Sequence, residues 1–209
     1  MKPLTDITDI DHMFRIELPD YIKTIINALT AEGFEAYAVG GCVRDSFLGR
    51  SPDDWDVTTS ALPAQVKSVF KRTVDTGIEH GTVTVLIGKN SSEVTTYRVD
   101  GDYEDFRHPK KVEFTASLEE DLKRRDFTIN AMAYNDEKGL VDIFDGRGDL
   151  ERKVIRAVGD PRERFNEDAL RILRAIRFSA QLGFEIDEET RNAMSELAPN
   201  LRAVSAERI

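Results

Sequence analysis

The chain has 209 residues, of which 40% are hydrophobic and 33% charged, enough for one globular domain with an appendage. A net charge of −10 argues against nucleic-acid binding by simple attraction, and no apolar run reaches the roughly 20 residues of a membrane helix. One cysteine and three scattered histidines exclude an intrachain disulfide and a thiolate or histidine metal site. Because the N-terminus lacks a basic and then apolar signal pattern, we expect a cytoplasmic protein with no membrane partner.

The first elements predict a helix, a strand and a phosphate-binding turn. Apolar residues recur on one face of residues 18–29, which predicts a helix, and residues 35–39 are predicted to form a strand. The following pair, Gly40 and Gly41, opens a brief helix over residues 42–48, so its backbone N–H groups can point at a phosphate. Arg44, one turn along, could grip the same phosphate. A plain strand-to-helix turn is the alternative.

Two aspartates separated by one residue carry the next prediction. Side chains alternate along the strand predicted from Trp55, so Asp54 and Asp56 face one side and Trp55 the other. Such close carboxylates repel each other unless a divalent cation lies between them. Oxygen-only ligands that leave room for substrate phosphates favour Mg²⁺. Solvated residues at a sheet edge are the alternative, because Asp-x-Asp is a common tripeptide.

A hairpin follows a helix that begins at Pro63. Residues 82–87 and 93–99 are rich in β-formers and flank a Gly-Lys-Asn turn, which predicts two paired strands. Glu93, on the second strand, could be a third carboxylate near the metal. A structural ion pair between Glu93 and Arg98, or a lysine, is at least as plausible.

The middle of the chain is strongly charged. Residues 101–111 carry a proline and no periodicity, which predicts a mobile loop. A short helix over residues 118–123 is expected to have an acidic surface made of Glu119, Glu120 and Asp121. The adjacent Arg124 and Arg125 that follow suit a triphosphate or a ribose, and surface ion pairing is the equal alternative.

The remaining chain predicts strands and then long helices. Residues 128–134 and 140–144 are expected to be strands, followed by a turn at Asp145 and Gly146, and long helices begin after Pro161. This pattern is typical of an α+β head to about residue 150 and a helical neck. Residues 205–209 begin a helix that has no length to run, so we expect a longer protein.

The neck helix separates apolar from charged residues. On a helical wheel of about 100° per residue, one half is apolar. The other half carries Asp168, Arg171, Arg174 and Arg177. Arginines at every third position suggest selection for their forked geometry. Residues 151–177 contain eight basic and five acidic residues, a basic patch of the kind that RNA contact would require.

The Asp168–Arg171 pair has the chemistry of a base template. Cytosine and adenine share an edge with an amino donor beside a ring-nitrogen acceptor. A carboxylate accepts from the amino group while a guanidinium donates to the ring nitrogen. Uracil and guanine would leave both protein groups unpaired, at roughly 1–3 kcal/mol per group. The pair therefore predicts a slot that accepts C and A.

With these segments in order, the chain resembles bacterial class II tRNA nucleotidyltransferases, the CCA-adding enzymes of the DNA polymerase β-like superfamily. The resemblance begins near Tyr37 and rests on Gly40-Gly41-Cys42-Val43-Arg44-Asp45, Leu48-Gly49-Arg50, Asp54-Trp55-Asp56, Arg124-Arg125-Asp126-Phe127-Thr128-Ile129-Asn130-Ala131, Asp145-Gly146 and Glu167-Asp168-Ala169-Leu170-Arg171. It implies a nucleotidyltransferase head over residues 1–150, with a small mixed or antiparallel sheet flanked by helices. An all-helical neck over residues 151–209 would follow, ending before further tRNA-binding helical domains.

The resemblance also implies residue roles. Metal binding falls to Asp54 and Asp56, and contact with the nucleotide phosphates and sugar to Gly41, Arg44 and Arg125. The base would be templated by Asp168 and Arg171, with Arg174 and Arg177 in support. The loop over residues 101–111 would switch the enzyme from CTP to ATP, and the Asp145–Gly146 turn would act as a hinge.

The implied activity is the addition of C, C and A to the 3′ end of tRNA from CTP and ATP, by Mg²⁺-dependent two-metal transfer with release of pyrophosphate. An apparently full-length loop favours complete addition over a CC-only enzyme. A bacterial poly(A) polymerase, which shares the head and neck motifs, is the nearest alternative. A catalytically silent nucleotide- or RNA-binding module is the other, and the intact aspartates and arginines argue against it.

Overall fold

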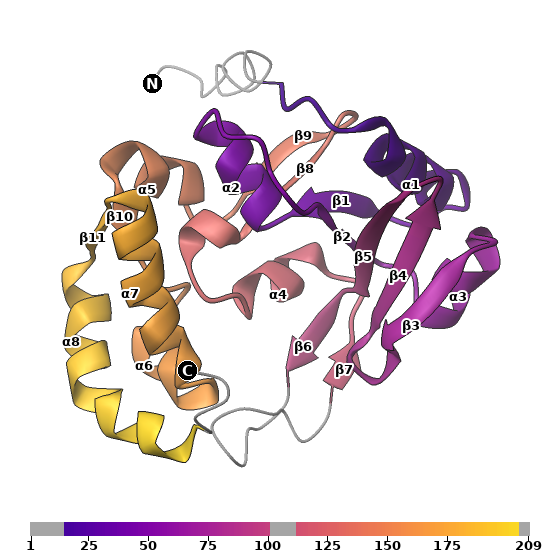
Figure 1. Cartoon of the computed structure of the whole chain (residues 1–209). Coiled ribbons are helices and arrows are strands. Elements are labelled where there is room, and N and C mark those ends of the chain that lie inside the picture. The colour runs from indigo at the N-terminus through magenta and orange to yellow at the C-terminus, as the bar shows by residue number, and fades with distance from the viewer. Residues whose placement is uncertain (1–14, 101–111, 205–209) are drawn as a thin grey trace, which may run out of the picture.

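The computed structural model describes residues 15–100 and 112–204 (Figure 1). The head is built on one seven-stranded sheet, in the spatial order β3 (Thr73–Gly77), β4 (Thr82–Ile87), β5 (Asn90–Thr96), β2 (Asp56–Thr59), β1 (Ala36–Val39), β8 (Met132–Asn135) and β9 (Gly139–Asp142). Neighbouring strands are antiparallel except β2 and β5, which run parallel. The parallel pairing of β2 with β5 determines which of their residues lie next to each other at the site.

Helices cover both faces of the sheet. They are α1 (Asp20–Ala31), α2 (Gly41–Phe47), α3 (Pro63–Val69), α4 (Leu118–Lys123) and α5 (Gly146–Arg152). Strand β1 separates two cores because its side chains alternate. Ala36 and Ala38 join the main core under α1 and α3, whereas Tyr37 and Val39 join a smaller core with Leu122 of α4. The α4 side is the face that carries the site.

The neck packs against the head (Figure 1). Its elements are β10 (Val154–Ile155), α6 (Pro161–Glu167), α7 (Leu170–Leu182), β11 (Glu185–Ile186), α8 (Glu188–Leu197) and the 3₁₀ turn η4 (Ala198–Ala203). Phe127 of the head meets Phe178 of α7 edge to face, with ring centroids 5.9 Å apart. Both rings belong to the main core, which therefore continues from head to neck.

The expected α+β class and the hairpin are confirmed, and the helical neck is confirmed with one addition. The neck also contains a parallel strand pair, β10 with β11. The division at residue 150 stays a prediction. The predicted mobile loop over residues 101–111 and the helix start at residues 205–209 lie outside the described residues. Short antiparallel strands, β6 (Arg98–Asp100) and β7 (Val112–Phe114), flank the first of these segments.

Two local predictions were wrong, and one strand was missed. The expected strand over residues 128–134 is the 3₁₀ turn η3 (Thr128–Asn130) followed by β8. The expected turn at Asp145 and Gly146 is the start of α5, with Asp145 at the N-cap. Strand β3 was not predicted at all, because it lies at a sheet edge and is largely exposed. In the described part of the chain, each helix is too short or too polar to cross a bilayer.

Gly146 is required by packing rather than by its backbone angles. A Cβ there would overlap the carbonyl oxygen of Thr128 and lie 2.9 Å from Cγ of Met132. Since one obstacle is backbone, the neighbouring turn would have to move.

We expect Gly146→Ala to lower the free energy of unfolding by about 1–3 kcal/mol, the usual cost of overpacking. Urea denaturation measures it. Gly77→Ala is the control, because its Cβ would lie an ordinary 3.6 Å from Cβ of Thr82. Equal midpoints for the two variants would contradict the steric explanation.

Candidate active site

The two predicted metal-binding aspartates lie at the start of β2. The strand begins at Asp56, and Asp54 precedes it by two residues in the connecting segment. Trp55, only 6% exposed, joins the main core, while Asp54 and Asp56 are exposed. The alternation predicted from the sequence is therefore present, although Asp54 lies outside the strand.

Glu93 lies beside these aspartates because β2 and β5 are parallel. Val57 is opposite Val94, and continuing this register by one residue places Asp56 next to Glu93. A pocket of about 430 Å³ is lined by Asp54, Asp56 and Glu93, with Thr84 and Ser91 among its other residues. Within the described residues, Glu93 forms no ion pair with Arg98 or a lysine. Its proposed part in catalysis stays a prediction that this placement favours.

The charge around Asp56 is suited to a cation. Loss of water around this carboxyl raises its pKa, the negative charges of Glu93 and Asp54 raise it further, and Arg125 opposes them. A hard cation would relieve this repulsion, and the donors are all oxygen. In the ranges 15–100 and 112–204, no three acidic, histidine or cysteine side chains form a ready-made metal cluster. A site of one or two carboxylates completed by substrate phosphates does not need one.

The glycine turn lies next to the aspartates. Val39 pairs with Asp56, so the turn at Gly40 follows directly beside the carboxylates. Gly40 has φ +81°, and a Cβ there would lie 3.2 Å from Nη1 of Arg125. The sequence directed attention to Gly41, which begins α2, whereas Gly40 is the position whose backbone requires glycine.

Arg44 is held by three partners from different elements. Its Nε and Nη2 each donate to Asp45 at 2.9 Å, and Nη1 donates to Asn130 at 2.7 Å. The guanidinium also lies 5.1 Å from the ring centroid of Phe178. It ties α2 to η3 and α7, and its predicted contact with a phosphate stays a prediction.

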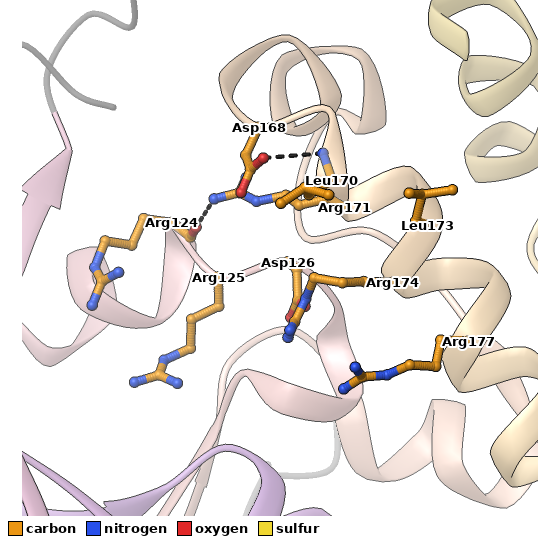
Figure 2. Close-up of a pocket in the computed structure, with 9 residues that line it drawn as sticks. All are labelled: Arg124, Arg125, Asp126, Asp168, Leu170, Arg171, Leu173, Arg174 and Arg177. Atoms are coloured by element: carbon orange, nitrogen blue, oxygen red, sulfur yellow. Dashed lines mark hydrogen bonds and ion pairs between the residues drawn. The ribbon is translucent and has the colours of Figure 1, made fainter. Parts of the chain in front are cut away.

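A second pocket, of about 610 Å³, lies between the head and the neck and is called the neck pocket below (Figure 2). All of the predicted neck residues line it, together with three consecutive residues of the head. The full set is Arg124, Arg125, Asp126, Asp168, Leu170, Arg171, Leu173, Arg174 and Arg177. Arg125 lines this pocket, and its Nη1 lies 3.2 Å from the position of a Cβ on Gly40. Since Val39, the residue before Gly40, pairs with Asp56, the guanidinium of Arg125 extends from this pocket toward the carboxylates.

The helical wheel placed Asp168 and Arg171 on one continuous helix, and this prediction was wrong. The helix breaks between α6 and α7, and Asp168 caps the break by accepting the Leu170 N–H at 3.0 Å (Figure 2). Arg171 is held by Glu167 at 2.7 Å and donates to the carbonyl oxygens of Arg164 and Arg124. Both side chains are thereby fixed at the pocket wall without pairing with each other.

Arg174 and Arg177 differ in their surroundings. Arg174 pairs with Asp126 of the head, with Nη2 2.6 Å and Nε 2.8 Å from Oδ2. Sequence reasoning missed Asp126 as this partner. Arg177 is exposed, and its guanidinium lies 5.8 Å from the Phe178 ring centroid. Of the two, Arg177 is the more available for a ligand.

Asp121 was predicted on the acidic surface of its helix and is instead fully buried. Its carboxylate binds Thr58, Arg124 and Arg125. The spacing of Asp121 to the two arginines, three and four residues, was the available sequence signal.

Carboxylates of two sheet strands thus lie near a pocket rich in arginine, an arrangement suited to a metal ion and phosphate groups. Residues 36–156, more than half of the chain, match the family described as poly A polymerase head domain. Residues 183–209 match the family described as probable RNA and SrmB-binding site of polymerase A. The chain belongs to the poly A polymerase head domain family.

Relatives and solved structures give closer comparisons. A CCA-adding enzyme of Streptococcus suis is 56% identical over 184 residues, 88% of this chain and 46% of that protein. The structure of the Bacillus stearothermophilus CCA-adding enzyme in complex with CTP has a TM-score of 0.83 at 46% identity, covering 89% of this chain and 45% of that one. A tRNA nucleotidyltransferase complexed with a primer tRNA and an incoming ATP analog has a TM-score of 0.69 at 35% identity, covering 84% and 50%. The chain thus spans about half the length of the proteins it matches.

The Asp126–Arg174 pair predicts a pH-dependent contribution to stability. Burial alone would raise the pKa of Asp126, but Arg174 and the hydrogen bonds from Arg174, Asn130 and the Phe127 N–H lower it overall. A carboxyl with a lowered pKa stabilises the fold fully above its unfolded pKa of about 3.9, and this contribution is lost as the pH falls through the folded pKa.

We expect Asp126→Asn to lower the free energy of unfolding at pH 7 by roughly 1–3 kcal/mol, less than for a fully buried ion pair because Arg174 is half-exposed. The difference from the unsubstituted protein should shrink below about pH 4. Denaturation at a series of pH values measures it. A constant difference across that series would show that the charge of Asp126 is not the cause.

Proposed function

We propose that this chain supplies the catalytic head and nucleotide-binding neck of an enzyme that adds C, C and A to the 3′ end of tRNA. The substrates would be CTP and ATP, and pyrophosphate would be released. The observation that carries the proposal is the position of Arg125, which lines the neck pocket with Asp168 and Arg171 and reaches the Gly40 turn beside Asp56. A nucleotide whose base lies in the neck pocket would have its triphosphate directed past Arg125 to the carboxylates.

The relatives support this activity. They are named CCA-adding enzymes, and the solved structures similar to this chain include complexes with CTP, an ATP analog and a primer tRNA. Because the chain covers about half of these proteins, the activity is proposed for the complete protein.

The residues divide the work of the reaction. Asp54 and Asp56, with Glu93 beside them, would hold Mg²⁺, which when bound supplies charge neutralisation at the triphosphate and acidifies the 3′-hydroxyl. Arg125 would bind a phosphate, and the turn at Gly40–Gly41 would let backbone N–H groups approach the same nucleotide. Arg44 and Arg177 would add positive charge at the pocket. Catalysis of phosphoryl transfer depends mostly on such positioning and neutralisation.

Base selection would fall to Asp168 and Arg171. The Leu170 N–H already binds one oxygen of Asp168, and within the described residues no protein group binds the other. Glu167 and two carbonyl oxygens hold Arg171, but these three bonds use fewer than its five N–H donors. One acceptor and at least one donor are thus left for the edge that cytosine and adenine share.

Other expected roles belong to the same proposal. We retain the switching function of residues 101–111, the hinge at Asp145 and Gly146, the supporting role of Arg174 and a cytoplasmic location. The Asp126 pair makes Arg174 a link between head and neck, which is a support of the pocket rather than a direct contact.

Poly(A) polymerase activity is the second candidate, because the description of the family that matches residues 36–156 names a poly A polymerase. Offering CTP and ATP, together and singly, to a tRNA that ends at its discriminator base separates the two. Extended growth with ATP alone favours a polymerase, whereas growth limited to C, C and A with both nucleotides favours the first proposal.

For the carboxylates, we expect Asp56→Ala to reduce nucleotide incorporation by at least about a thousandfold, because charge neutralisation at the triphosphate would be lost. The fold should persist, since the side chain of Asp56 reaches solvent and its carboxylate is repelled by those of Glu93 and Asp54. Radiolabelled CTP incorporation measures the loss, and circular dichroism checks the fold. Asp53→Ala, at an exposed carboxylate three residues earlier, is the matched control. Normal turnover by Asp56→Ala would rule out the metal assignment.

For the template, we expect Asp168→Ala or Arg171→Ala to reduce the preference for CTP over UTP by roughly tenfold or more, the value of one buried polar pairing. The ratio of kcat/KM values for the two nucleotides measures it. Glu163→Ala, at an exposed residue of α6, is the control. Unchanged discrimination in both variants would count against the template.

A further inference from the structure

Asp121 of α4 is a fully buried carboxylate that lines neither pocket. It lies between the strand that carries Asp56 and the arginines that line the neck pocket. Fully buried charges are costly unless they are paired, so its partners account for its presence. Because these partners belong to β2 and to the arginines after α4, Asp121 connects the two parts of the site.

One oxygen of Asp121 reaches the catalytic strand. Oδ2 accepts the hydroxyl of Thr58 at 3.0 Å, and Thr58 follows Asp56 by two residues on the same side of β2. The other oxygen, Oδ1, accepts from Nε of Arg124 at 3.0 Å and from its Nη2 at 2.7 Å. The backbone N–H of Arg98 also donates to Oδ1, at 3.4 Å. Asp121 is thus fixed from the sheet side and from its own helix.

The contact of Asp121 with Arg125 is of a different kind. Nη2 of Arg125 lies 3.4 Å from Oδ2, a long and weak hydrogen bond. Nε of Arg125 is buried and has no hydrogen-bond partner within the described residues. The guanidinium is therefore held in place mainly by charge. Across the described part of the chain, the carboxylate of Asp121 is the one hydrogen-bond acceptor for its N–H groups.

A second carboxylate competes for Arg125. Nη1 of Arg125 lies 3.2 Å from the position of a Cβ on Gly40, and Val39, the preceding residue, pairs with Asp56, so the negative charge of Asp56 lies on the other side of the guanidinium from α4. Because opposite charges attract, loss of the negative charge of Asp121 is expected to let the guanidinium shift toward Asp56. Asp121 thus balances Asp56 and keeps Arg125 between the two pockets.

We propose that Asp121 is a positioning residue that acts through Arg125, holding its guanidinium ready for a phosphate group of the incoming nucleotide. The inference rests on the proposed function, because it concerns the same nucleotide. Asp121 lines neither pocket, so Arg125 rather than Asp121 would contact the phosphate.

Asp149 provides a matched control. It too is a fully buried carboxylate, and it binds the hydroxyl of Thr128 at 2.7 Å and two arginines, Arg152 and Arg156. None of these residues lines either pocket. Asp149→Asn therefore reproduces the loss of a buried, paired charge without the connection to Arg125.

The test is CTP affinity in the complete protein, measured by calorimetry with Mg²⁺ and no primer, so that no transfer occurs. We expect Asp121→Asn to weaken CTP binding about tenfold, close to the loss of one charged hydrogen bond. Arg125→Ala should weaken it at least as much, and the double variant should bind no more weakly than Arg125→Ala alone. Asp149→Asn should keep its affinity within about twofold while lowering the unfolding midpoint.

Two outcomes would overturn the inference. They are an unchanged affinity in Asp121→Asn, and additive losses in the double variant, which would mean that Asp121 does not act through Arg125. If Asp121→Asn fails to fold, Thr58→Val takes its place, with an expected loss of about threefold that disappears in the Arg125→Ala background. Failure of the unsubstituted protein to bind CTP or extend tRNA would instead overturn the proposed function.

Discussion

The neck is joined to the head at the C-terminal end of α4, and the shape of the pocket between head and neck depends on this junction. The last carbonyls of a helix have no partner within it, and arginines are well suited to bind them. Arg164 donates to the Lys123 carbonyl at 2.8 Å and Arg171 to the Arg124 carbonyl at 3.0 Å. Glu167 binds both arginines and sets them side by side. The residues after α4 are thereby fixed against the neck.

The same region concentrates positive charge in a protein whose net charge is −10. The arginines can remain close together because neighbouring groups offset the positive charge of each guanidinium. Carboxylates supply part of it, and the ring of Phe178 supplies another part. Guanidinium groups from Arg44, Arg174 and Arg177 lie 5.1, 5.3 and 5.8 Å from its centroid, within the range of cation–π attraction. The pocket is therefore basic without being strongly repulsive in itself.

Sequence reasoning succeeded where the cause was local and failed where it was tertiary. The shared side of Asp54 and Asp56 follows from the alternation of a strand, so it could be predicted. Glu93 could be offered from the sequence only as one of two alternatives, because its closeness to the aspartates depends on the pairing of β2 with β5, which no local pattern encodes. The helix break at Asp168 was missed because the apolar periodicity continues across it, and the burial of Asp121 depends on the packing of α4 against the sheet.

Trp55, the chain's single tryptophan, lies between the two aspartates in sequence and points to the opposite side, into the main core. Indole emission is sensitive to the polarity and the charge near the ring. In this chain all of that emission arises from one residue at the start of β2. The chain thus contains its own optical reporter beside the aspartates, and the ion binding proposed there can be tested by fluorescence without a label.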